Sequence, residues 1–111
     1  MKYLNQLNDS GNTKAMSLLF SKTCYIQYID KSRKESVEAF RKKLVDNGWY
    51  APGIDFVEGN YMTSIKYFHP EDEALVNNLK NLLGYSNVIS TPVYRYGTRV
   101  PKGQVEVWIG K

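Results

Sequence analysis

The stretch Cys24-Tyr25-Ile26-Gln27-Tyr28-Ile29 decides the fold. Its β-branched and aromatic side chains predict a strand. A helix is expected next, because Ser32 and Glu35 have the spacing of a capping box, in which each side chain binds a free amide of the first helical turn. Apolar side chains then recur at helical spacing up to a stop signal at Asn47-Gly48; they are Val37, Phe40 and Leu44.

The same strand-and-helix pattern returns 39 residues further along the chain. The segment Ser64-Ile65-Lys66-Tyr67-Phe68 predicts a strand. A helix start is predicted at Pro70-Glu71-Asp72-Glu73, because proline suits the first helical position and acids suit the positive end of the helix dipole. Gly84 ends this helix. The shift aligns Ile26 with Ile65, Tyr28 with Tyr67, Ile29 with Phe68, Val37 with Val76, Phe40 with Leu79, and Leu44 with Leu83.

Two strand-helix-strand units in tandem predict an α+β fold of the ferredoxin-like βαββαβ type. We expect a four-stranded antiparallel sheet with both helices on one face. The stretch from Trp49 to Val57 is extended but contains Pro52, which predicts an edge strand. Val88-Ile89 indicates the start of a further strand, residues 90–103 a long loop, and the alternation from Val105 to Ile109 a last strand. Residues 1–22 are expected to form an N-terminal arm or helix, and residues 23–111 the βαββαβ ligand-binding domain.

This order of elements, the tandem repeat and the size resemble the SPOR and LytR C-terminal families of small bacterial domains, over residues 23–111. The resemblance to SPOR domains implies binding to glycan strands of the cell wall, which requires export. The string Ile65-Lys66-Tyr67-Phe68-His69-Pro70-Glu71-Asp72 and the ending Val105-Glu106-Val107-Trp108-Ile109-Gly110 resemble an unnamed domain appended to bacterial caspase-like and TIR-type defence proteins.

Composition indicates one domain in a reducing compartment. A chain of 111 residues that is 42% hydrophobic can bury a core, and it lies below the length at which chains divide into domains. Its single cysteine, Cys24, excludes an internal disulfide. The first residues lack an apolar run of signal-peptide length, and no run is long enough to span a membrane. These features predict a cytoplasmic protein that does not enter membranes.

The net charge of +4 comes from one segment. From Ala74 to Val105 there is no acidic residue, whereas Lys80, Arg95, Arg99 and Lys102 are basic. Elsewhere the basic and acidic residues balance. Such a segment attracts anions, but it offers too few phosphate contacts for nucleic acid, which is therefore an unlikely partner.

Two clusters are candidate ligand-binding sites. At the start of the first helix, Lys31, Arg33 and Lys34 surround free helix-terminal amides, which suits a phosphate or carboxylate. The alternative is that these cations face water, with Lys34 paired to Glu38 at helical spacing. In the long loop, aromatic rings and guanidinium groups alternate, a pattern that can stack on a base and hold its phosphate; this cluster comprises Tyr94, Arg95, Tyr96, Arg99 and Lys102. The alternative here is that the tyrosines pack on the sheet edge.

Neither nucleophile nor base is placed for catalysis, so we expect no enzyme activity. His69, the one histidine, is expected to cap the second helix, and Cys24 to be a buried strand thiol. No phosphate loop, dinucleotide fingerprint or metal-ligand spacing is present, so no cofactor or metal is expected.

The sequence therefore predicts a non-catalytic module that binds a small anionic ligand, with a nucleotide-derived signalling molecule in bacterial or phage defence as the expected class. The alternatives are a SPOR-like glycan binder and a protein-protein adaptor. An adaptor, or a homo-oligomer, would use the N-terminal arm or an edge strand, for which the strand containing Trp108 is the candidate.

Overall fold

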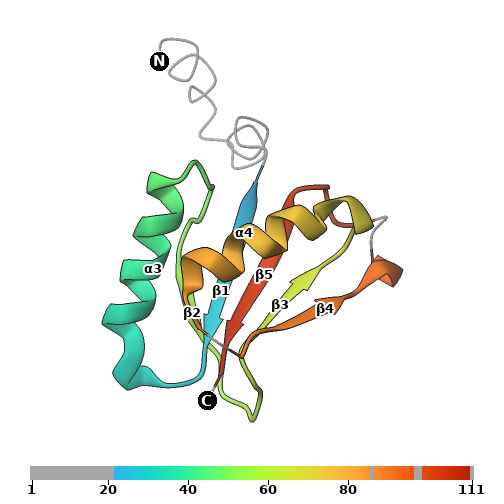
Figure 1. Ribbon diagram of the computed structural model, residues 1–111. Coiled ribbons are helices and arrows are strands. Elements are labelled where there is room, and N and C mark those ends of the chain that lie inside the picture. The colour runs from blue at the N-terminus through green and yellow to red at the C-terminus, as the bar shows by residue number, and fades with distance from the viewer. Residues whose placement is uncertain (1–21, 86, 97–98, 111) are drawn as a thin grey trace.

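Five strands form one mixed sheet in the computed structural model, which describes residues 22–85, 87–96 and 99–110. Their order is β2-β1-β5-β3-β4 (Figure 1). Strand β1 pairs in parallel with β2 and β5, β3 pairs in parallel with β4, and β3 and β5 are antiparallel. The strands are β1 (Thr23–Tyr28), β2 (Ile54–Phe56), β3 (Ser64–Tyr67), β4 (Ile89–Pro92) and β5 (Gln104–Ile109).

The two halves repeat as the sequence predicts. Helix α3 (Lys34–Asp46) connects β1 to β2, and helix α4 (Glu73–Leu83) connects β3 to β4. A 3-10 turn precedes each helix, η2 (Lys31–Arg33) before α3 and η3 (Pro70–Asp72) before α4. The starts of both turns and both helices are therefore 39 residues apart.

The α+β class is confirmed, but the expected four-stranded antiparallel sheet is wrong, and the ferredoxin-like arrangement is not confirmed. In that arrangement another strand separates the two parallel strands of each unit. Here each helix returns the chain directly beside the strand it left, so β1 contacts β2 and β3 contacts β4. Residues 90–103 are also not all loop, because they contain most of β4 and the short helix η4 (Tyr94–Tyr96).

The sheet edges follow from this topology. Strands β2 and β4 lie at the two edges, so the edge position predicted for the segment containing Pro52 is confirmed for β2. Strand β5 pairs on both sides, which corrects the expectation that Trp108 lies on an edge strand. On β4, Pro92 has no backbone N–H to offer a further strand. The predicted arm at residues 1–22 lies, apart from Lys22, outside the described residues.

Both helices cover the same face of the sheet (Figure 1). Alternate side chains of β1, β3 and β5 are buried against them, as the period of two in a strand requires. The four helical residues that the repeat places in the core, Phe40, Leu44, Leu79 and Leu83, are all buried. The helices thus supply one half of the core and the sheet the other.

Candidate functional site

The two predicted binding clusters lie at opposite ends of the sheet. Helix α3 begins where β1 ends, whereas η4 follows the end of β4. Strand β4 is parallel to β3. Strand β3 is antiparallel to β5, and because β5 is parallel to β1, β4 runs in the opposite direction to β1. Figure 1 shows the start of α3 and the end of β4 far apart in this way. The two clusters are therefore separate sites.

At the start of α3, the chain supplies its own anion. The Asp30 carboxylate accepts hydrogen bonds from the Ser32 amide at 2.9 Å and the Ser32 hydroxyl at 2.7 Å. These bonds lower the pKa of Asp30, and the Arg33 guanidinium at 3.8 Å contributes to the same shift. The capping box predicted for Ser32 and Glu35 is wrong, because Asp30, two residues before Ser32, holds the cap position with an extended backbone and its side chain accepts from the Ser32 amide.

The lysines of this first cluster are dispersed. The Lys31 ammonium lies 4.7 Å from the centre of the Phe56 ring, in a cation-π contact. Lys34 is exposed on the first turn of α3. Its expected partner Glu38 instead forms an ion pair with Arg41, so the predicted Lys34–Glu38 pairing is wrong. In the described structure, therefore, the charged groups of these three residues do not point towards one common position.

The second cluster forms a hollow beside the end of β4. Thr91, Pro92, Val93, Tyr94 and Arg95 line a space of about 380 Å³. Tyr94 is 48% exposed, and its ring and that of the buried Tyr67 meet edge to face at 5.8 Å between centres. The Tyr94 and Tyr67 hydroxyls share a hydrogen bond at 3.4 Å, and this bond, with burial of Tyr67, raises the pKa of Tyr67 to about 12. Tyr94 is therefore held against Tyr67 while about half of its surface stays exposed to solvent.

The repeat extends to this aromatic pair. At the other end of the sheet, Tyr28 meets Phe56 edge-on, also at 5.8 Å. Tyr28 is the counterpart of Tyr67 in the 39-residue shift, and each partner follows an edge strand or lies in it. The two pairs differ in where the neighbouring cation lies, because the Lys31 ammonium covers the Phe56 ring whereas Arg95 is the exposed residue after Tyr94 in the chain.

The remaining residues of the predicted loop cluster separate into three groups. Arg99 is exposed, and the side chain of Tyr96 lies outside the described part of the structure. Lys102 forms an ion pair with Glu71 at 2.7 Å, which lowers the pKa of Glu71 and raises that of Lys102. Of the five residues, the structure therefore places Tyr94 and Arg95 in one hollow, whereas Lys102 is paired with Glu71.

Three contacts hold residues 100–103 against the start of α4. Besides the Lys102–Glu71 pair, the Gly103 amide donates to the buried Asp72 carboxylate at 2.8 Å. The His69 Nε2 lies 2.6 Å from the Val100 carbonyl oxygen. His69 occupies the N-cap position before η3, as expected, but its ring makes no cap hydrogen bond to a helix amide and contacts this loop instead.

The Glu71–Lys102 pair makes a testable prediction about pH. Glu71 has a lower pKa in the folded chain than its ordinary 4.5, so its contribution to holding the loop is present above that value and is lost as the pH falls through the folded-state pKa. Replacing Lys102 with Gln is expected to raise the pKa of Glu71 towards its ordinary value. Carboxyl NMR titration measures this, with Lys80→Gln as the control that leaves Glu71 unchanged. An unchanged Glu71 titration in Lys102→Gln would contradict the pairing.

Sequence reasoning missed the sheet face that the helices leave uncovered. There the Lys66 ammonium lies 4.3 Å from the centre of the Trp108 ring, and Tyr61 meets the same ring edge-on at 5.3 Å. The Trp108 Nε1–H donates to Glu106 at 3.1 Å. The alternation of Gln104, Glu106 and Trp108 along β5 was the available signal, because alternate residues of a strand share a face.

Cys24 is fully buried, which raises the pKa of its thiol and confirms the predicted buried position. Within residues 22–85, 87–96 and 99–110, no group of three metal-ligating side chains is close enough to hold an ion. No helix in the same ranges is long and apolar enough to cross a membrane.

Comparison of the chain with protein-family models, with curated proteins and with solved structures gave no match.

Proposed function

We propose that this chain is a non-catalytic cytoplasmic module that binds a small anionic ligand, a nucleotide-derived signalling molecule, at the hollow beside β4. The observation that carries the proposal is the pairing of the half-exposed Tyr94 ring with the Arg95 side chain in one hollow. An aromatic face can stack on a base, and a guanidinium group binds phosphate oxygens in a fixed fork geometry. A volume of about 380 Å³ falls in the range of small-ligand pockets.

Two further features support this hollow over the start of α3. The segment from Ala74 to Val105 contains no acidic residue, so an anion here meets no like charge from that segment. At the start of α3, by contrast, the Asp30 carboxylate already binds the Ser32 amide and hydroxyl, and an incoming anion would have to displace it.

A titration with defined nucleotides tests the proposal. Cyclic di-AMP and AMP are the probes, and isothermal titration calorimetry gives their affinities. Replacing Arg95 and Arg99 together with Gln is expected to weaken binding by about 1.5–3 kcal/mol, the size of one hydrogen bond to a charged partner. Unfolding midpoints should stay the same, because both side chains are exposed.

The matched control replaces Lys31, Arg33 and Lys34 with Gln. It removes one more positive charge than the Arg95/Arg99 variant, so general electrostatic attraction would weaken binding at least as much in the control. Equal or greater weakening in the control contradicts the proposed position. If none of the nucleotides binds the unaltered chain, the nucleotide proposal itself is wrong.

A protein-protein adaptor is the second candidate function, and the uncovered sheet face favours it. Aromatic rings are enriched where proteins meet, and Trp108 and Tyr61 supply two of them on one face. This surface replaces the edge strand expected from the sequence. Weaker capture of a partner by Trp108→Ala, with nucleotide binding unchanged, would favour this function over the first.

A further inference from the structure

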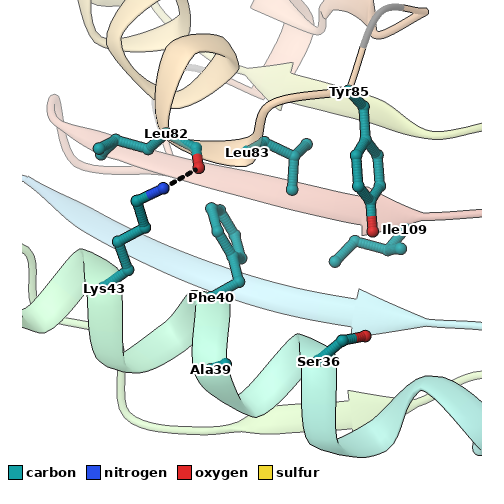
Figure 2. Close-up of a pocket in the computed structure, with 8 residues that line it drawn as sticks. All are labelled: Ser36, Ala39, Phe40, Lys43, Leu82, Leu83, Tyr85 and Ile109. Atoms are coloured by element: carbon teal, nitrogen blue, oxygen red, sulfur yellow. Dashed lines mark hydrogen bonds between the residues drawn. The ribbon is translucent and has the colours of Figure 1, made fainter.

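A second hollow lies between the two helices on the covered side of the sheet. One wall is the side of α3 that carries Ser36, Ala39, Phe40 and Lys43, whose spacing of three and four residues puts them on one helix face. The opposite wall is the end of α4 with Tyr85 beyond it, and Ile109 of β5 closes the base (Figure 2). The hollow measures about 280 Å³. None of its lining residues belongs to the proposed nucleotide site.

The floor of this hollow consists of core side chains that remain partly accessible to solvent. Phe40 and Leu83 keep 8% and 9% of their surface, whereas Leu44 and Leu79, also buried in the two helices, keep none. The helices therefore close over the deeper residues and part over Phe40 and Leu83. An apolar group placed here would cover the exposed surface of Phe40 and Leu83, which is favourable in proportion to the area removed from water.

Polar groups stand around this apolar floor. The Lys43 ammonium donates to the Leu82 carbonyl at 3.1 Å across the two helices, and an ammonium has three N–H groups in all. Figure 2 shows the Lys43 amine and the Tyr85 hydroxyl at the two sides of the Phe40 ring. Gly84 ends α4 in the left-handed conformation, at a φ of 76°, and so turns the chain to place Tyr85 over the hollow. A cation thus stands on one side of the apolar floor and a phenol on the other.

We infer that this interhelical hollow binds a small aryl-alkyl carboxylate, with its ring on Phe40, Leu83 and Ile109 and its carboxylate at Lys43. A cavity of about 150 Å³ holds one benzene ring. A hollow of about 280 Å³ therefore has room for one ring with a short acidic chain, but it is smaller than the usual range for larger ligands. The single cation facing the hollow sets the preference for an acid over an amine.

The experiment uses 3-phenylpropionate as the probe and the full chain. Two-dimensional NMR titration is expected to show saturable shifts at the side chains of Phe40 and Ile109. The alcohol 3-phenylpropanol, which lacks the charge, should bind about tenfold more weakly or worse, since a hydrogen bond to a charged group is lost. The Arg95→Gln, Arg99→Gln double variant should bind the probe normally, which separates this site from the proposed nucleotide site.

Three variants locate the ligand. Lys43→Gln is expected to weaken binding of 3-phenylpropionate about tenfold or more, whereas Lys42→Gln, an equal change of net charge at the next residue of α3, should leave it unchanged. Ala39→Leu fills the hollow from an exposed helical position and should abolish binding without lowering the unfolding temperature. No saturable shifts at Phe40 and Ile109 with millimolar probe, or equal weakening by Lys42→Gln and Lys43→Gln, would overturn the inference.

Discussion

Replacing Gly110 with Ala is expected to destabilise the folded chain strongly. A Cβ at this position would overlap the Tyr61 carbonyl oxygen and lie 2.7 Å from the Met62 carbonyl carbon. Both neighbours are backbone atoms, so no side-chain rotation relieves the clash, and the connection between β2 and β3 must move. We expect a loss of about 3 kcal/mol or more in the free energy of unfolding, at or beyond the upper end of ordinary overpacking.

The same displacement would break a specific hydrogen bond. The Gly110 amide donates to the Thr63 hydroxyl at 3.1 Å in a buried position, and a buried donor without a partner is costly. Urea denaturation followed by fluorescence measures the loss. Gly53→Ala is the matched control, because a Cβ there would meet nothing within 4 Å, and it should change stability by less than about 0.5 kcal/mol. Equal stabilities for the two variants would contradict the close approach at Gly110.

The helices and their burial were predictable from the sequence because both depend on local periodicity. Apolar residues at helical spacing identify α3 and α4, and the 39-residue shift puts Phe40 and Leu79 in equivalent places. Sheet order was not predictable in this way. A strand's side-chain pattern shows which face is buried but not which strand lies beside it, so nothing local placed β5 between β1 and β3.

The candidate site was less predictable than the fold, since contacts between distant parts of the chain decide which charged side chains are paired. The pattern from Tyr94 to Lys102 indicated one basic surface, but Lys102 is held by Glu71, 31 positions earlier in the sequence. At the other cluster the decisive group is the Asp30 carboxylate, which binds the Ser32 amide although the sequence pattern favours Ser32 itself as the cap. The hollow between the helices requires knowing how Tyr85 turns after Gly84, which only the folded backbone shows.

Replacing Phe40 with Ala is expected to cost about 3–5 kcal/mol, as for other large aromatic residues removed from a core. Phe40 packs with the buried side chains of both helices and of the sheet, and it stands where α3 and α4 approach each other over β5. Its removal would enlarge the existing hollow, because the two helices are kept from moving together. The Lys43–Leu82 hydrogen bond joins them, and each helix is anchored by the pair of parallel strands that it connects, β1 with β2 and β3 with β4. A residual cavity adds its own penalty to the lost burial.

The matched control for Phe40 lies in the same helix. Val45 is 46% exposed, so Val45→Ala removes apolar atoms from α3 without opening the core and should change stability by no more than about 0.5 kcal/mol. Denaturant unfolding of both variants gives the comparison. Leu79→Ala, at the equivalent position of α4, should cost about 2–5 kcal/mol, the range for a buried leucine. The contrary outcome is that Phe40→Ala unfolds at the same midpoint as Val45→Ala while Leu79→Ala is destabilised. The two halves would then not share the core equally, and Phe40 would belong to the wall of the hollow and not to the core beneath it.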